Sequence, residues 1–448
     1  MKKILCMIAT TMMIPTFALA GDPAPSGAQP QSETAAIMVP VQSKFNLSIG
    51  GFVRLDYAYN SVNLGPAGWW SPGSGVPSTG TKGATPAANQ EQSIFSPKGT
   101  RLWIKSTGPD YLGGKTSAII EADFNGDASS GSESPQPRLR LAKADIKWDS
   151  FEVLFGEDWD IFGPMVAASL DFRNGTVFGT PNSQRVPQIR ITKKLALNDD
   201  NSIKLVLGVQ DPSQQGNNSN ATAATSFTSY GPSVNVAGQF SFISKSIGTA
   251  PGFYGLSMKP LTLTLFGLYG TEKAPSNNNA GIDSYGYGFY TFVPVMSSKD
   301  GKSRSGSVSF EGQIYGAANM AFNNATFGTV VGTPTALSAT LAATASQSPA
   351  QGFGYAAQII AYPTQELGVT VGYGSRNARD FDSYAGIADY QRSNSSLYAN
   401  VAYDFNAAIR LATEYQNLNT IYGNANGVAG AKAVGSDNTI RLVATYFF

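Results

Sequence analysis

Alternation of apolar and polar residues with a period of two dominates this 448-residue chain from residue 45 to its end. In one segment, Leu367, Val369, Val371 and Tyr373 share one parity, and smaller or polar residues occupy the other. Successive side chains of a β-strand point to opposite faces, so such a segment predicts a strand with one apolar face. A soluble β-sandwich would show the same alternation, and the connections between the strands distinguish the two folds.

The alternating segments predict about sixteen strands, with eighteen as the alternative count. They lie near 45–59, 100–107, 116–124, 138–148, 151–158, 187–196, 202–210, 232–243, 261–270, 282–295, 305–317, 352–362, 367–375, 395–405, 408–417 and 438–448. Long connections alternate with short ones along the chain. The long connections are 60–99, 125–137, 159–186, 211–231, 318–351, 376–394 and 418–437. One segment, 244–260, is long where a short turn is expected, and Phe253–Met258 could form an extra strand there.

This alternation of short turns and long loops is typical of bacterial outer-membrane barrels. Inside hydrocarbon every backbone N–H and C=O must be paired, so a sheet that spans a membrane must close on itself. We therefore predict an all-β, transmembrane antiparallel β-barrel over residues 45–448, in the outer membrane of a Gram-negative bacterium. Its short turns would face the periplasm and its long loops the exterior.

The first twenty residues have the pattern of a secretory signal peptide. Lys2 and Lys3 precede an apolar run, and Ala18-Leu19-Ala20 supplies a small-x-small cleavage site, so we expect cleavage after Ala20. The alternative, a transmembrane helix, is disfavoured because the run is short for the hydrocarbon core. Residues 21–44 are rich in Pro, Ser, Ala and Gln, and we expect a periplasmic tail there.

The chain also ends on an alternating strand: Ile440, Leu442, Ala444, Tyr446 and Phe448 share one parity. A terminal Phe preceded by an aromatic residue two positions earlier resembles the signal that the barrel-assembly machinery recognises. We expect the barrel-assembly machinery to recognise Tyr446 and Phe448.

Composition excludes several other functions. The chain has no histidine, so no Ser-His-Asp or Cys-His site can form and zinc would lack its usual imidazole ligand. Its 31 Lys and Arg residues are balanced by 30 Asp and Glu residues, which gives no basic footprint for nucleic acid. Glu121 and Asp123 resemble a catalytic carboxylate pair only superficially, because basic neighbours are expected across the sheet. We predict neither catalytic residues nor a metal site nor a cofactor.

If the apolar faces contact lipid, the opposite parity lines the lumen. The predicted lining residues of the first half are Arg54, Asp56, Arg101, Lys105, Glu121, Asp123, Lys143, Asp145, Lys147, Glu152, Arg190, Lys194 and Lys204. The second half supplies Arg410 and Arg441 with Glu311, Asp404 and Glu414. Bases outnumber acids on the first wall, and basic rings in a lumen favour anions. The alternative is that these charges pair with one another and only solvate the interior.

Two further features concern this lumen. General porins fold one loop into the channel, and we expect 159–186 to do so, carrying Asp160, Asp171, Arg173 and Arg185 to the charged wall. The alternative is an ordinary external loop. We expect Trp148 and Trp159 to be interfacial girdle residues.

Arg138 and Arg140 share the parity of lipid-facing residues. A bulge after Pro137 could turn them inward, or they could lie at the outer rim and bind lipopolysaccharide phosphate, and the sequence favours neither.

The chain resembles the DcaP-like porins in Gly51-Phe52-Val53-Arg54-Leu55-Asp56, in 114–124, in Arg138-Leu139-Arg140 and in 155–162, over roughly residues 50–195. The resemblance implies a trimeric, sixteen-stranded channel for small anionic solutes such as dicarboxylates. Residues 21–44 depart from it, because they show no clear pattern of a periplasmic helix.

We therefore predict an outer-membrane porin for passive diffusion of small hydrophilic solutes, with a preference for anions. Expected partners are outer-membrane lipid and lipopolysaccharide, the barrel-assembly machinery and two further copies of the chain. The alternative is an adhesin or receptor barrel with a plugged lumen, for which the absence of conductance would be diagnostic. An outer-membrane enzyme is disfavoured without histidine, and a plug-domain transporter without the extra N-terminal residues.

Overall fold

The computed structural model describes most of the chain beyond residue 44. The described residues are 45–64, 76, 90–126, 135–171, 177–180, 185–211, 234–255, 257–274, 280–318, 351–379, 390–423 and 433–448. The predicted signal peptide, the predicted tail and Arg173 lie outside them. Within the described part, no helix has the length and apolar character needed to cross a membrane.

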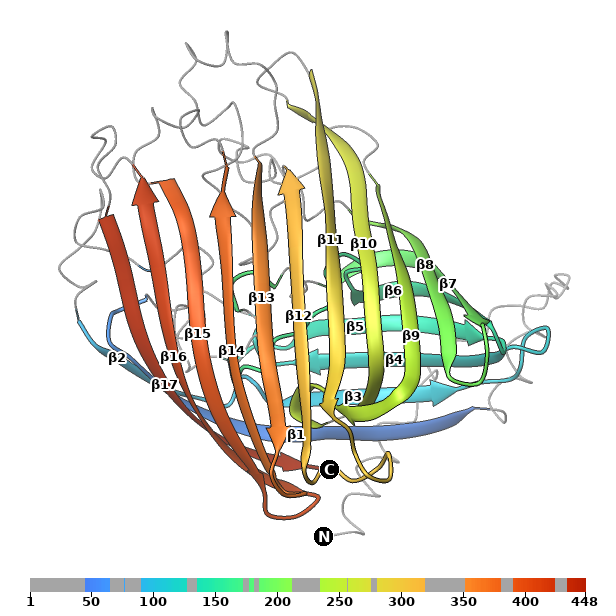
Figure 1. The fold of residues 1–448 in the computed structure, drawn as a ribbon, viewed down its shortest axis with the longest axis horizontal. Coiled ribbons are helices and arrows are strands. Elements are labelled where there is room, and N and C mark those ends of the chain that lie inside the picture. The colour runs from blue at the N-terminus through green and yellow to red at the C-terminus, as the bar shows by residue number, and fades with distance from the viewer. Residues whose placement is uncertain are drawn as a thin grey trace, which may run out of the picture. The chain divides into compact units, whose positions relative to one another are not determined.

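Every described strand runs antiparallel to its neighbours in one sheet, as Figure 1 shows. The strands are β1 (Asn46–Asn60), β2 (Gln92–Ser96), β3 (Arg101–Thr107), β4 (Lys115–Asp123), β5 (Arg138–Lys147), β6 (Phe151–Trp159), β7 (Arg185–Ala196), β8 (Asn201–Gln210), β9 (Asn235–Pro251), β10 (Met258–Ala274), β11 (Ala280–Met296), β12 (Ser307–Ala318), β13 (Gln351–Tyr362), β14 (Leu367–Ala378), β15 (Tyr390–Asp404), β16 (Ile409–Gly423) and β17 (Ala433–Phe447).

The sheet closes where the last strand pairs with the first. Asp56 of β1 lies opposite Val443 of β17, and the backbones of Gly51 and Phe448 exchange two hydrogen bonds of 3.1 Å. On its other side β1 pairs first with β2 and then with β3, so these two segments together occupy one position in the barrel. The seventeen strands therefore make a closed barrel of sixteen positions, which confirms the predicted fold.

The interruption between β2 and β3 explains why the sequence did not predict β2. Pro97 and Gly99 separate the two segments and break the alternation, since proline cannot donate to a ladder and glycine has no side chain to pack. The five residues of β2 therefore fell within a predicted long loop, 60–99.

The outer face of the barrel carries the exposed apolar side chains. On β13 and β14 these include Ile359, Val371 and Tyr373, and on β16 and β17 Leu411 and Leu442. Many polar residues of the opposite parity face the interior and are buried, among them Gln358 and Glu414. A continuous apolar exterior of this kind is unfavourable in water and is what the hydrocarbon core of a membrane accommodates.

A bulge in β5 decides the orientation of two arginines. Glu121 of β4 lies opposite Leu141, whereas the next residue, Ala122, lies opposite Leu139, so Arg140 is an extra residue in the ladder. Leu139 is accordingly 49% exposed and Leu141 only 9%. Arg138 and Arg140 face inward for this reason, which is the first of the two alternatives given above. The bulge comes at Arg140, however, and not directly after Pro137.

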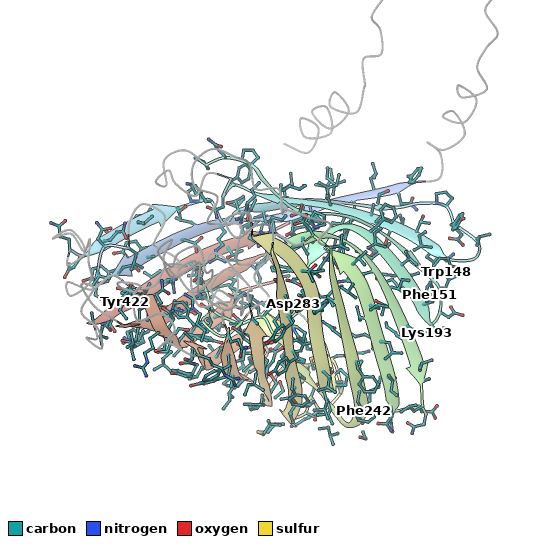
Figure 2. All side chains as sticks on the ribbon, turned by 90° about the horizontal axis from the view of Figure 1, so that it is seen from above. Trp148, Phe151, Lys193, Phe242, Asp283 and Tyr422 are labelled. Carbon is teal, nitrogen blue, oxygen red and sulfur yellow. The ribbon has the colours of Figure 1, made fainter. Side chains whose placement is uncertain are left out.

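The short connections form one end of the barrel, hereafter the short-turn end. There Trp148 packs against Phe151 with ring centroids 5.7 Å apart, and its Nε1 donates to the carbonyl of Leu112 at 3.0 Å. Figure 2 shows Trp148 and Phe151 together at this end, next to Lys193, whose Nζ donates to Ser150.

The suggestion of an extra strand at Phe253–Met258 is wrong. β9 continues to Pro251 and β10 starts at Met258, which leaves a short connection with one 3-10 turn, Phe253–Gly255. Tyr254 has φ 48° and Gly255 has φ 67°, and these left-handed conformations are incompatible with an extended strand.

Candidate functional site

The loop that leaves β6 lies against the inner faces of distant strands. The backbone N–H of Met165 donates to Gln313 of β12 at 3.2 Å, and that of Ala168 donates to Gln358 of β13 at 2.7 Å. The amide of Gln358 also donates to the carbonyl of Val166 at 3.2 Å. Side-chain amides on the inner parity thus satisfy backbone groups that an irregular loop cannot pair within itself.

Glu414 of β16 is the strongest anchor of this loop. Its carboxylate accepts from the hydroxyl of Ser169 at 2.9 Å and from the N–H of Leu170 at 2.7 Å. It also accepts from Asn400 at 3.0 Å and from Arg441 at 2.8 Å. Four donors around one buried carboxylate replace the water that it loses.

These contacts bury the polar residues on one side of the interior. We call the inward-facing residues of β12–β17 the covered wall. Its central residues Glu311, Gln358, Tyr398, Glu414 and Gln416 are all buried, although polar groups on an inner barrel face would otherwise meet water.

The inner faces of β3–β8 differ, and we call them the open wall. Lys143 of β5 and Arg190 of β7 both bind Asp158 of β6, at 2.9 and 2.8 Å. The two basic side chains are each 19% exposed, whereas the side chain of Asp158 is 6% exposed. The bases are therefore the more accessible groups on this inner face, and they cover the acid between them.

A second ion cluster on the open wall repeats this order at Arg138 and Asp123, whereas its central base, Arg140, is only 1% exposed and Glu121 is 12% exposed, as side chains. Arg138 binds Asp123 at 2.6 Å, and Arg140 binds both Glu121 and Asp123, at 2.7 and 2.9 Å. Arg138 is 27% exposed and Asp123 is 4% exposed, as side chains. Arg101 approaches Glu121 only to 3.5 Å. These contacts bring together the predicted Arg101, Glu121 and Asp123.

Trp159 lies close to two guanidinium groups, those of Arg140 and Arg185, which are 5.9 and 5.2 Å from the centre of its ring. We expected this residue to be an interfacial girdle residue. The structure places it beside the ion cluster, in contact with these two arginines, and its girdle role stays a prediction.

The other predicted lining residues fall into two groups. Arg54 and Asp56 form a buried pair at 2.6 Å beside the covered wall, and Asp145 is also buried. The second group consists of exposed bases nearer the short-turn end: Lys105, Lys147 and Lys194. Lys147 reaches Glu152 only at 3.8 Å.

The loop residues predicted to face the charged wall are divided. Arg185 belongs to β7 and stacks on Trp159, whereas Asp171 is buried 4.0 Å from Arg441 on the covered wall. Asp160 is buried at the start of the loop, where one of its oxygens accepts from the N–H of Phe162 and from Gln210, both at 2.8 Å. Burial raises the pKa of Asp160 to about 6, and these hydrogen bonds offset only part of that effect.

Tyr254 is a site residue that sequence analysis missed. It lies in the turn between β9 and β10, and its hydroxyl donates to the carbonyl of Ser169 in the loop. Arg410 of β16 donates to the backbone carbonyl of Tyr254 at 3.4 Å. Nothing in the local sequence marks a turn tyrosine as the partner of a residue 85 positions away.

Solved structures of outer-membrane channels share this fold. The outer membrane channel DcaP of Acinetobacter baumannii is 17% identical over 91% of this chain and 98% of its own, with a TM-score of 0.61. An anion-selective porin from Comamonas acidovorans is 11% identical over 90% and 100%, with a TM-score of 0.52, and OprB of Pseudomonas putida is 11% identical over 90% and 94%, with a TM-score of 0.50. No protein-family model and no curated protein matches the sequence. The chain therefore has the porin fold, and its similarity to DcaP agrees with the sequence resemblance.

Proposed function

We propose that this protein is a DcaP-like porin of the Gram-negative outer membrane, through which small hydrophilic solutes diffuse passively. The solute path runs along the open wall. The loop after β6, which lies against the covered wall, reduces the width of this path. Export by the signal peptide, assembly through Tyr446 and Phe448, and a homotrimer surrounded by lipid and lipopolysaccharide complete the proposal.

The order of charges on the open wall carries the proposal of anion preference. Lys143, Arg190 and Arg138 are partly exposed, whereas Asp158 and Asp123 beneath them are buried. A solute on this side of the lumen therefore meets positive charge first, and the low dielectric of the barrel wall strengthens that field. Small anions, including dicarboxylates, fit such a path.

Conductance of the purified protein in a planar lipid bilayer tests both parts of the proposal. We expect stable ion currents and, in a salt gradient, a reversal potential of the sign that anions produce. The preference should weaken as salt is raised, because the Debye length falls from about 10 Å at 0.1 M to about 3 Å at 1 M. A cation preference would contradict the assignment of the open wall. A total absence of current would favour an adhesin or receptor whose lumen is plugged.

A further inference from the structure

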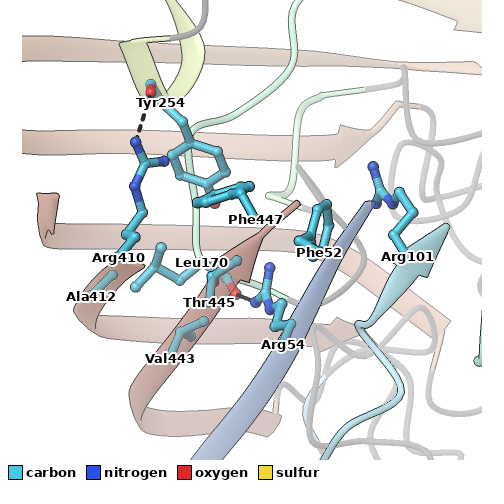
Figure 3. A pocket seen from close by; sticks show the side chains of 10 residues that line it. All are labelled: Phe52, Arg54, Arg101, Leu170, Tyr254, Arg410, Ala412, Val443, Thr445 and Phe447. Atoms are coloured by element: carbon cyan, nitrogen blue, oxygen red, sulfur yellow. Dashed lines mark hydrogen bonds between the residues drawn. The ribbon is translucent and has the colours of Figure 1, made fainter. Parts of the chain in front are cut away.

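A cavity of about 110 Å³ lies between the loop and four strands of the barrel, β1, β3, β16 and β17. Figure 3 shows Phe52 and Phe447 side by side in it, with Leu170 of the loop nearby. The two phenyl rings meet edge to face with centroids 5.8 Å apart. Val443 and Ala412 add further apolar surface, so most of the lining is hydrocarbon.

The charged part of the lining is basic. Three arginines, Arg54, Arg101 and Arg410, contribute to the cavity, and none of its ten lining residues is an acid. Two of these arginines already hold a carboxylate outside the cavity. Arg54 binds Asp56 at 2.6 Å, and Arg410 binds Asp404 at 2.5 Å.

Arg101 differs from the other two arginines. Its ion-pair partner Glu121 is 3.5 Å away, and the same oxygen of Glu121 accepts from Arg140 at 2.7 Å. Nε of Arg101 is buried and has no hydrogen-bond partner among the described residues. The guanidinium is held over the ring of Phe52, 5.2 Å from its centre. A fixed guanidinium whose nearest carboxylate is shared with Arg140 therefore borders an apolar cavity, and its side chain stays 15% exposed.

We propose that this cavity is a binding site for short-chain monocarboxylates, with the carboxylate on Arg101 and the hydrocarbon chain against Phe52 and Phe447. The site rests on the proposed porin function, because solutes reach it through the lumen. A guanidinium binds a carboxylate with paired, charge-assisted hydrogen bonds, and the apolar walls stabilise a chain that water solvates poorly. A dicarboxylate of similar length would instead bring its second charge against hydrocarbon, which costs desolvation free energy.

Blockade of the ion current by hexanoate tests this site in the full-length protein in planar bilayers. We expect hexanoate to reach half-blockade at a concentration roughly tenfold lower than acetate, because the apolar walls bury part of its four additional CH₂ groups. Adipate, which has the same number of carbons and a second carboxylate, should block less well than hexanoate. Equal potency of hexanoate and acetate would overturn the proposal and leave the porin function intact.

Two substitutions separate the charge from the cavity. Arg101→Gln should raise the half-blocking concentration of hexanoate about tenfold, the loss expected for one charge-assisted hydrogen bond. Ala412→Leu keeps every charge but fills part of the cavity, and it should remove the difference between hexanoate and acetate. Retention of wild-type blockade by both variants would overturn the site.

Lys115→Gln is the matched control, because it removes one positive charge from an exposed pair with Asp110 near a short turn. It should leave hexanoate blockade unchanged. An effect equal to that of Arg101→Gln would mean that the overall charge of the protein controls the blockade, and it would overturn the site. Migration of each variant as a folded barrel in gels before heating shows that it has assembled. Absence of current in the wild type would overturn the porin function and this site together.

Discussion

The covered wall and the open wall belong to one sheet and obey the same alternation, yet they use polar residues in opposite ways. On the covered wall Gln313, Gln358 and Glu414 bind backbone groups of the loop and are buried. On the open wall Lys143 and Arg190 bind a buried acid and keep part of their surface exposed. Inner parity therefore identifies which residues face the interior, whereas contact with the loop determines which of them a solute can reach.

The largest expected effect comes from breaking the covered wall at Glu414. Glu414→Ala removes the carboxylate that holds Arg441, Ser169 and the N–H of Leu170. Breaking a buried ion pair in this way costs about 3–5 kcal/mol of unfolding free energy, and release of the loop should also raise single-channel conductance. Urea unfolding in lipid and bilayer recording measure the two effects.

The neighbouring Thr413→Ala is the control for this substitution, because Thr413 is exposed on the outer face. It should change the unfolding free energy by less than about 0.5 kcal/mol. If Glu414→Ala behaved like Thr413→Ala, the loop would not depend on this anchor.

A second experiment removes the two partly exposed bases that cover Asp158 on the open wall. The double variant Lys143→Gln, Arg190→Gln uncovers Asp158 and should reduce the anion-to-cation permeability ratio by roughly threefold or more, with little change in conductance. The reversal potential in a salt gradient measures this ratio. Lys193→Gln removes a charge at the short-turn end and should leave the permeability ratio unchanged. An equal shift of the ratio in this variant and in the double variant would mean that net charge sets the anion preference, and not the order of charges on this wall.

The smallest effect concerns Asp160, which lies where the loop begins. Its pKa of about 6 in the folded protein exceeds the ordinary value of 3.8, so the folded state holds this proton more tightly than the unfolded state. The resulting stabilisation is complete below pH 4 and is lost as the pH rises through 6. Asp160→Asn removes this dependence, and its advantage over the wild type should grow from near zero at pH 4 to about 1–3 kcal/mol at pH 7. Unfolding free energies across that range measure it, and a constant difference would contradict the assignment.

Much of the barrel was predictable because alternation is a local property. The strand positions and the inward orientation of Arg54, Arg101 and Lys143 follow from period-two counting from their neighbours. Counting fails at Arg140, because a single bulge reverses the parity and its position depends on pairing with Glu121, 19 residues away.

The covered wall was not predictable from the sequence in the same way. Glu414 was expected to face the lumen, but its partner Leu170 lies 244 residues earlier in the chain. Tyr254 likewise depends on a left-handed turn conformation and on a distant carbonyl. Contacts at such separations follow from closure of the whole barrel, and no short pattern encodes them.

The anchoring of the loop by buried amide and carboxylate groups has a consequence for how the proposed channel responds to salt. Dissolved ions weaken fields between exposed charges but act little on buried contacts. As salinity rises, the aperture should therefore keep its dimensions while its discrimination by charge fades. The same molecule would then sort solutes by sign in dilute surroundings and mainly by size in concentrated ones.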